Sequence, residues 1–108
     1  MAGKFEILKS ASGYRFNLKS GNGEIVFSSE NYESESAARE GAESVMNNAM
    51  QDARYEHKTD ASGAGYFVLK AGNGEIIGRS ETYSSEQALE KGIQAVKMNA
   101  SDASIVSA

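Results

Sequence analysis

The chain lacks several residue types that carry familiar chemistry. It has no cysteine, which excludes a disulfide framework and a thiolate metal site. Its single histidine, His57, offers too few ligands for a metal site of its own. No apolar run approaches the ~20 residues of a membrane-spanning helix, and the first five residues show no signal-peptide pattern. We therefore predict no metal and no cofactor, and we expect a cytoplasmic protein.

The charge balance is mildly acidic. The sequence has 11 basic and 15 acidic side chains, for a net charge of −4. This balance provides no overall attraction to nucleic acid or to an anionic membrane. The content of 40% hydrophobic and 24% charged residues is typical of a globular chain, and 108 residues suffice for one modest core. We predict a single domain over residues 1–108.

The dominant pattern is an internal repeat. The motif around Asn22-Gly23 returns around Asn73-Gly74, an offset of 51 residues (73 − 22). Between residues 16–49 and 67–100, 18 of 34 aligned positions are identical, so the two halves should fold alike. We place the repeats at about 1–51 and 52–108.

Each Asn-Gly pair predicts a tight β-hairpin with a two-residue type I′ turn, in which both turn residues have positive φ. Glycine-rich turns can also cradle phosphate, but those loops run from a strand into a helix, whereas these join two strands. The predicted turn sets the register and places Lys19 opposite Val26. One face then carries the apolar side chains of the hairpins, which are Phe16, Leu18, Ile25 and Phe27 in the first repeat and Phe67, Leu69, Ile76 and Gly78 in the second.

An amphipathic helix follows each hairpin. Ser34 and Ser85 suit the N-cap position, and the apolar spacing predicts helices that end near Asn48 and Asn99. Two glycines, Gly41 and Gly92, lie at equivalent places inside these helices. A glycine there costs about 1 kcal/mol relative to alanine, which predicts close packing of the helix against the sheet, with a hinge as the alternative.

Further strands are predicted at residues 4–9, 54–59 and 104–107. The resulting fold class is α+β, with two tandem strand-strand-strand-helix repeats forming one antiparallel sheet. Both helices should lie on one face of the sheet. The two halves should share strands through a pseudo-twofold axis.

Several motifs together resemble the YegP-like family of uncharacterised small bacterial proteins. The resemblance spans nearly the whole chain and depends on both Gly-Asn-Gly-Glu-Ile turns, Tyr14-Arg15-Phe16-Asn17-Leu18-Lys19, Ser29-Glu30 with Tyr32, Ser80-Glu81 with Tyr83, and Gly92-Ile93-Gln94-Ala95-Val96-Lys97-Met98-Asn99. It implies tandem repeats that share one sheet and exchange C-terminal strands. It implies no established activity, cofactor or catalytic residue.

A few side chains could still carry chemistry. His57 lies on a predicted strand between Glu56 and Lys58 and is read as a partly covered strand residue. The first repeat has Ile7 at the matching place, so the resemblance assigns no role to His57. Glu24 and Glu75 lie beside turns, where carboxylates are solvated, and they could act as an acid/base pair only if the hairpin tips met. Tyr32 and Tyr83 should pack their loops onto the helices, with two ligand-facing rings as the alternative. We assign no catalytic residue.

The face of the sheet away from the helices is the preferred binding surface. It gathers basic and apolar side chains, namely Arg15, Lys19, Val26, Val68, Lys70, Ile77 and Arg79. The alternative is an ordinary solvated face with cross-strand ion pairs such as Arg15 with Glu30. Single-stranded RNA is disfavoured because the phenylalanines fall on the covered face, where they could not stack on bases.

These observations favour a non-catalytic module that binds a protein or an anionic ligand through the open sheet face. The alternative is a structural or stress-related protein without a specific ligand, and an enzyme ranks third. A protein partner is favoured over nucleic acid, and no membrane association is expected. We predict a monomer with an internal pseudo-twofold axis, while a dimer through the sheet edges stays open.

Overall fold

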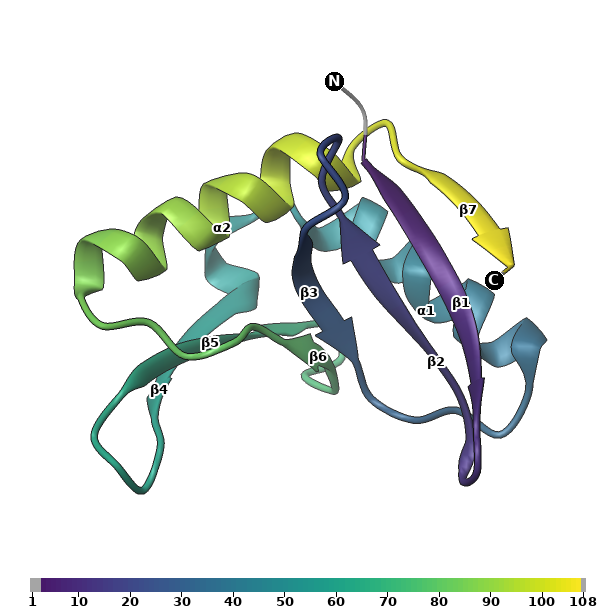
Figure 1. Cartoon of the computed structure of the whole chain (residues 1–108), viewed down its shortest axis with the longest axis horizontal. Helices are drawn as coiled ribbons and strands as arrows, with labels where there is room; N and C mark the ends of the chain where they lie inside the picture. The colour runs from purple at the N-terminus through teal and green to yellow at the C-terminus, as the bar shows by residue number, and fades with distance from the viewer. Residues whose placement is uncertain (1–2, 108) are drawn as a thin grey trace.

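A computed structural model describes residues 3–107 of the chain. Three strands are followed by a helix, and this order occurs twice before a last strand (Figure 1). The elements are β1 (Lys4–Ser10), β2 (Gly13–Lys19), β3 (Ile25–Ser29), α1 (Glu35–Asn48), a 3-10 turn η1 (Asp52–Arg54), β4 (Tyr55–Thr59), β5 (Gly65–Lys70), β6 (Ile76–Arg79), α2 (Glu86–Ala100) and β7 (Ser104–Ser107). Within this part of the chain, no helix is long and apolar enough to cross a membrane.

All seven strands form one sheet in the order β4-β5-β6-β3-β2-β1-β7. The first six pair antiparallel, whereas β7 lies parallel to β1, so the sheet is mixed. Strand β7 follows the helix of the second repeat but pairs with the first strand of the first repeat. The α+β class, the tandem repeats and the exchange of the C-terminal strand are confirmed.

A pseudo-twofold axis runs between the two repeats. Ser28 of β3 pairs with Arg79 of β6, and these two residues are equivalent under the repeat, since 79 − 28 = 51. A residue can face its own equivalent in antiparallel strands only where a twofold axis passes between them. The sheet is therefore continuous across the junction of the repeats.

Both helices begin as the sequence predicted. The hydroxyl of Ser34 accepts a hydrogen bond from the backbone N–H of Ala37, at 3.0 Å. Ser85 does the same for the N–H of Ala88, at 3.1 Å. Each cap satisfies a donor that has no partner within the helix, which fixes where α1 and α2 start relative to the sheet.

One core joins both repeats and both helices. Fully buried strand phenylalanines (Phe5, Phe16, Phe27 and Phe67) pack with small and branched residues of the helices (Ala38, Ala42, Val45, Leu89, Ile93 and Val96). Because these side chains form a single cluster, α1 and α2 cover the same apolar face of the sheet. Figure 1 shows α1 behind β1 and β2.

Aromatic rings pack against the glycines inside the two helices. A methyl group on Gly41 would meet Tyr32 and the ring of Phe16, and one on Gly92 would meet Tyr83 and the ring of Phe67. The rings in each set are stacked, with centroids 6.2 Å apart for Phe16 and Tyr32. The tyrosines thus lie between their loops and the helices, which is the packing role expected from the sequence. Each tyrosine also lines a surface hollow, so the alternative of two ligand-facing rings stays a prediction.

The hairpin turns differ from the prediction. Gly23 has φ of 90° and Gly74 of 88°, but no described residue other than glycine has positive φ, so Asn22 and Asn73 do not form type I′ turns. The N–H of Gly23 donates to the carbonyl of Ser20 instead, at 2.9 Å, and a β-bulge follows. This is a three-residue loop in which glycine alone supplies the left-handed conformation.

The bulge shifts the register at the ends of the hairpins. Lys19 pairs with Ile25 and not with Val26, whereas the pairs Leu18–Phe27 and Asn17–Ser28 agree with the prediction. Ile25 is 47% exposed and Ile76 42%, so their assignment to the apolar face was wrong. The extra residue rotates the strand before it reaches the covered part of the sheet.

Candidate functional site

The open face of the sheet carries a row of cross-strand neighbours, one from each of several strands. Glu6, Asn17, Ser28, Arg79, Val68 and Glu56 follow one another across β1, β2, β3, β6, β5 and β4. The hydroxyl of Ser28 donates to the side-chain carbonyl of Asn17, at 2.9 Å. The centre of this row lies on the pseudo-twofold axis, so both repeats contribute to it.

The lysines of this face are neutralised within the sheet. Lys19 Nζ lies 2.8 Å from Glu6 Oε1, and Lys70 Nζ lies 2.8 Å from Glu56 Oε1. The Lys19 hydrogen bond holds the pKa of the Glu6 carboxyl below its ordinary value, and the Lys70 hydrogen bond does the same for the pKa of Glu56. These two pairs are equivalent in the repeat and lie on either side of the axis.

The arginines of this face are not neutralised in this way. Within residues 3–107, neither Arg15 nor Arg79 has a carboxylate within ion-pair distance, and the predicted pairing of Arg15 with Glu30 does not form. The Arg79 guanidinium lies over the ring of Tyr66, 5.9 Å from its centroid. The two arginines border a hollow of about 310 Å³. Its other lining residues are Ile25, Val26, Phe27, Ser28, Ser80 and Glu81.

Two of the seven residues assigned to the binding surface do not lie on an exposed surface. Val68 is 3% exposed and Ile77 is 4% exposed. Val68 lies between the long side chains of its cross-strand partners Glu56 and Arg79, and Ile77 falls at the bulge and packs into the core. Because both side chains are buried, Val68 and Ile77 do not belong to an exposed docking patch. Val26 is half-buried and lines the hollow.

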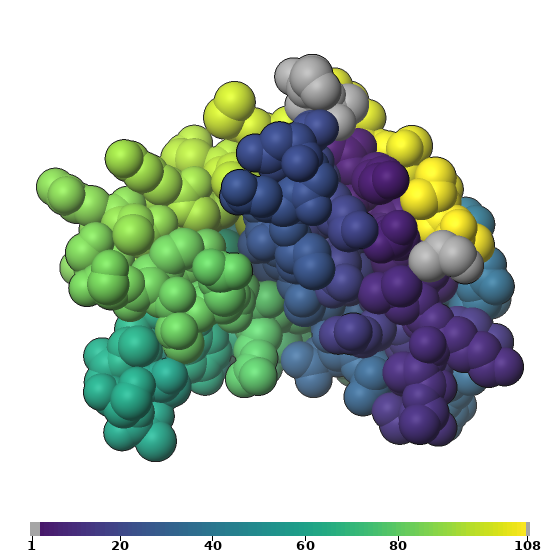
Figure 2. All heavy atoms as spheres, viewed as in Figure 1, coloured from purple at the N-terminus to yellow at the C-terminus, as the bar shows by residue number. Residues whose placement is uncertain are grey.

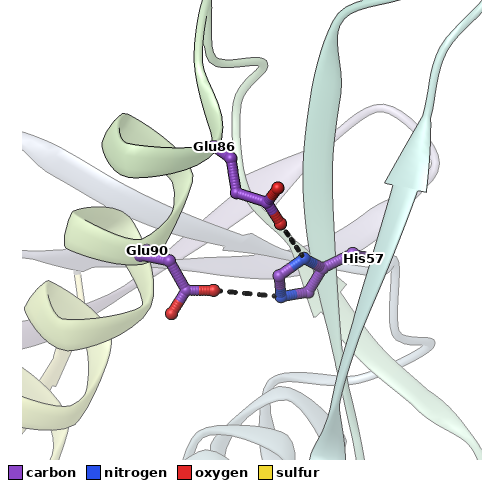
Figure 3. A group of neighbouring side chains, drawn as sticks. All are labelled: His57, Glu86 and Glu90. Atoms are coloured by element: carbon purple, nitrogen blue, oxygen red, sulfur yellow. Dashed lines mark ion pairs between the residues drawn. The ribbon is translucent and has the colours of Figure 1, made fainter.

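A second site, not predicted from the sequence, lies between β4 and α2. His57 Nδ1 is 3.6 Å from Glu86 Oε1, and His57 Nε2 is 3.4 Å from Glu90 Oε1 (Figure 3). The two glutamates stand one turn apart on the helix, so both side chains project toward the strand. The histidine side chain is 43% exposed. A hollow of about 500 Å³ and another of about 240 Å³ both include His57 in their walls.

These three side chains have the ligand types that bind divalent metal ions, and their ligand atoms lie within 4.8 Å of one another. The carboxylates, however, face opposite nitrogens of the imidazole (Figure 3). A single ion can bond to only one of those nitrogens. The arrangement therefore fits an imidazole held between two carboxylates better than a metal centre.

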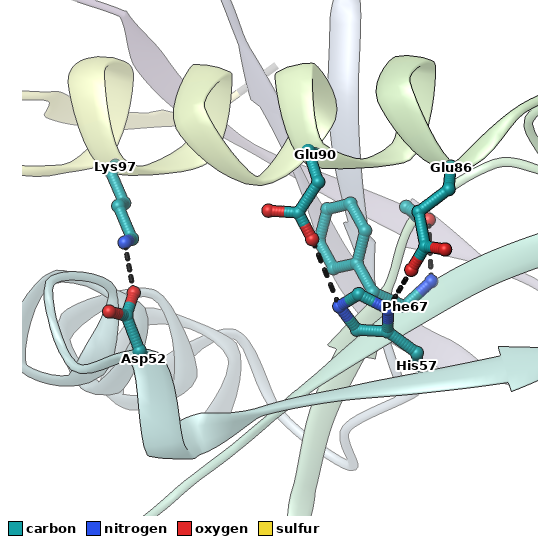
Figure 4. A network of polar contacts seen from close by, with 7 residues as sticks. Asp52, His57, Phe67, Glu86, Glu90 and Lys97 are labelled. Carbon is teal, nitrogen blue, oxygen red and sulfur yellow. Dashed lines mark hydrogen bonds and ion pairs between the residues drawn. The ribbon is translucent and has the colours of Figure 1, made fainter.

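An ion pair between α2 and η1 lies next to this site. Lys97 of α2 binds Asp52 of η1 (Figure 4). The Lys97 ammonium also lies over the ring of Tyr55. Tyr55 donates its hydroxyl to the carbonyl of Ala49 at 2.8 Å, and burial raises the pKa of this phenol, with a further contribution from Asp52. The start of β4 is thus anchored beneath α2.

The sequence signal for this second site lies in the differences between the repeats. His57 stands where the first repeat has Ile7, and Glu90 stands where it has Arg39. Neither substitution by itself indicates a site. The two side chains come together only because α2 packs beside β4. Glu24 and Glu75 remain exposed in separate hairpin turns, and neither belongs to the group of possible metal ligands found among the described residues.

Comparison with known proteins agrees with this architecture. A family model described as a domain of unknown function, DUF1508, matches residues 10–56 and again residues 60–107. The chain belongs to the DUF1508 family. The first match runs from the end of β1 through α1 to the start of β4, and the second runs from the residue after β4 through α2 to β7.

Curated relatives extend over almost the whole chain. A UPF0339 protein from the ptx operon 5′ region of Stutzerimonas stutzeri is 45% identical over 107 residues, which cover 98% of this chain and 96% of the relative. The UPF0339 protein YegP of Escherichia coli K12 is 49% identical over 100 residues, with 92% and 91% covered. The resemblance to the YegP-like family is confirmed, and the names of these relatives indicate no enzyme class.

Solved structures share the fold as well. The solution NMR structure of the E. coli protein of unknown function yegP superposes with a TM-score of 0.91 at 45% identity, covering 99% of this chain and 93% of that one. A UPF0339 protein from Shewanella oneidensis gives a TM-score of 0.90 at 41% identity, covering 99% and 92%.

Proposed function

We propose that the protein is a non-catalytic binding module that holds an anionic group, such as a carboxylate of a protein partner, on the open face of its sheet. The supporting observation is the contrast between the cations of that face. Lys19 and Lys70 are paired with carboxylates, whereas Arg15 and Arg79 border a hollow and have no such partner within residues 3–107. Arginine is well suited to this role because its planar guanidinium can bind a carboxylate or phosphate with two hydrogen bonds.

The geometry of the hollow limits what it can hold. Besides the two arginines, its polar lining residues are Ser28 and Ser80, and Glu81 adds an acidic residue to the lining. This composition favours one anionic group between the arginines over an extended polyanion. We therefore expect the partner to be a protein of the cytoplasm and not a nucleic acid, as the sequence predicted.

The direct test is an NMR titration of the ¹⁵N-labelled protein with two probes, inorganic phosphate and a capped peptide that carries a single glutamate. We expect amide shifts at Arg15, Ser28 and Arg79, and at least a fivefold weaker response in the Arg15→Gln/Arg79→Gln variant. The control variant Lys9→Gln/Lys91→Gln removes the same charge from exposed positions elsewhere and should respond like the unchanged protein.

Equal responses in the two double variants would mean that only net charge matters, and the proposal would fail. A pull-down from native lysate can then compare the unchanged protein with the Arg15→Glu/Lys70→Glu/Arg79→Glu variant. A partner that is lost from the charge-reversed face identifies the biological ligand. Identical lanes would favour a structural protein without a specific ligand.

A further inference from the structure

The two outer edges of the sheet are occupied differently. At one end, β7 covers the outer edge of β1, whereas β4 ends the sheet at the other, with no further strand from residues 3–107 beside it. Figure 2 shows β7 in yellow against the purple atoms of β1, with the teal atoms of the β4–β5 hairpin at the far side of the molecule. Since β1 and β4 are equivalent strands of the repeat, the edge of β4 corresponds to the one that β7 occupies.

The backbone of β4 presents hydrogen-bonding groups at this edge. Both backbone groups of Phe67 bond toward Ser80, the N–H at 3.0 Å and the carbonyl at 2.9 Å, and so point away from β4. His57 pairs with Phe67, so the N–H and carbonyl of His57 point outward from the sheet. By the same alternation, the carbonyl of Tyr55 and the N–H of Thr59 also face outward. An added strand could bond to these groups.

The occupied edge shows how such a strand is held. Ile105 lies opposite Phe5 and packs against the core, and Ser107 lies opposite Ile7. The Ser107 hydroxyl lies 2.8 Å from Glu35 Oε2 and accepts a hydrogen bond from Arg39 at 3.2 Å. The first two turns of α1 thus clamp one side chain of the strand, two residues after an apolar one.

The equivalent clamp in the second repeat has a different charge. Glu86 and Glu90 replace Glu35 and Arg39, so the clamp changes from one acid and one base to two acids. The hollows of about 500 and 240 Å³ flank His57 at this position. A serine hydroxyl could donate a hydrogen bond to only one of these carboxylates, whereas a lysine or arginine beside His57 would complement the charge of both.

We propose that the free edge of β4 binds an extended peptide that pairs parallel to β4. The peptide carries a lysine or arginine opposite His57, beside the two carboxylates of Glu86 and Glu90 that face the imidazole. This site uses a different surface from the arginines of the open face, and neither proposal depends on the other.

The test uses a capped hexapeptide with the sequence of residues 103–108 in which lysine replaces serine at the fifth position. Two further peptides carry glutamate at that position, or lysine together with N-methylation of a backbone amide that would pair with β4. Titration to 5 mM is followed through the ¹⁵N–¹H signals of Tyr55, His57 and Thr59. We expect these amides to shift, with at least threefold tighter binding of the lysine peptide than of either other peptide.

Variants of the protein separate the clamp from a general effect of charge. Glu86→Gln/Glu90→Gln should abolish the preference for lysine, whereas Glu40→Gln/Glu43→Gln, which removes the same charge from exposed positions of α1, should retain it. The preference should also weaken in 0.5 M NaCl because the pairs are exposed.

Three results would overturn the proposal. The β4 amides do not shift up to 5 mM, the lysine and glutamate peptides bind equally, or the shifts appear on the open face. Broadening of the β4 signals with protein concentration alone would show that a second copy of the chain covers the edge. That result would also reject the peptide as the occupant.

Discussion

The first repeat is closed on both sides, by β7 at one edge and by the second repeat at the other, whereas the second repeat ends at the free edge of β4. Features that depend only on neighbours along the chain are the same in both repeats. The N-caps, the turns at Gly23 and Gly74 and the tyrosine–glycine contacts all belong to this group. The two repeats differ in sequence at positions where a residue of one repeat contacts a segment that the matching residue of the other repeat does not contact.

Two places show this divergence. At the pseudo-twofold axis, Phe27 fills the space above its own equivalent, Gly78, because two phenylalanines could not occupy that position. At the outer edges, Ile7 is buried and pairs with Ser107 of β7, while His57 stays partly exposed between two glutamates. Duplication thus fixes the local structure, and the environment of each copy decides the remaining residues.

Removing the asymmetry at the axis should have the largest effect. In Gly78→Ala, the added methyl group would meet the Phe27 ring at 2.8 Å and, closer still, the backbone carbonyl of Ser28. A backbone atom cannot move aside as a side chain can. We expect the free energy of unfolding, measured by urea titration, to fall by about 3 kcal/mol.

The control for this change is Gly72→Ala. A methyl group there would meet only the Arg54 side chain, at 3.5 Å. We expect a change within about 0.5 kcal/mol. Losses of equal size at both glycines would show that alanine is disfavoured at either position for reasons other than contact across the axis.

A smaller effect is expected where the repeats agree. In Gly92→Ala, the methyl group would lie 2.6 Å from Tyr83 Cζ, which outweighs the ~1 kcal/mol that alanine gains in a helix. We expect a net loss of about 1–2 kcal/mol in urea unfolding. In a Tyr83→Ala background, the same change should cost less because only the Phe67 ring, at 3.2 Å, is then left in contact with the methyl group.

The first repeat offers the matched cycle, Gly41→Ala with Tyr32→Ala. Both cycles should show coupling of the same sign and similar size. A Gly92→Ala effect that is the same with and without the Tyr83 ring would disprove the contact as its cause.

The smallest effect concerns Tyr55, which stands where the first repeat has Phe5. Burial raises the pKa of Tyr55, so the folded chain keeps this proton at a pH where unfolded tyrosines, with pKa near 10, have lost it. Its contribution to stability is complete below about pH 10 and is lost as the pH rises above that value. Tyr55→Phe should lower stability by about 1 kcal/mol at pH 8, through the lost hydrogen bond to Ala49, and should flatten the decline above pH 10.

Urea titrations between pH 8 and pH 11.5 measure both parts of this prediction. Tyr32 and Tyr83 contribute declines of the same sign, since burial also raises the pKa of each, and these remain in the variant. An identical decline in Tyr55→Phe and the unchanged protein would show that Tyr55 does not contribute.

The fold was largely predictable because its signals are local and occur twice. The turn type was not, because Gly-Asn-Gly is compatible with two hairpin loops, and the choice of Gly23 as the residue with positive φ produced a bulge that shifted Lys19 by one partner. The same shift explains why Ile25 and Ile76 are exposed. The exposure of Val68 was predicted wrongly for another reason. Strand alternation predicts on which face of the sheet a side chain lies, but it does not predict whether neighbouring side chains cover it.

The sequence by itself determined the repeats, their order of three strands and a helix, the N-caps and the family, because each depends on residues that are near one another in the chain. Only the tertiary structure decided which arginines lack a partner, which edge β7 covers, and that His57 meets Glu86 and Glu90 from an element that follows 29 residues later (86 − 57). These features arise when distant segments pack together. The candidate binding surfaces of this protein are of that kind.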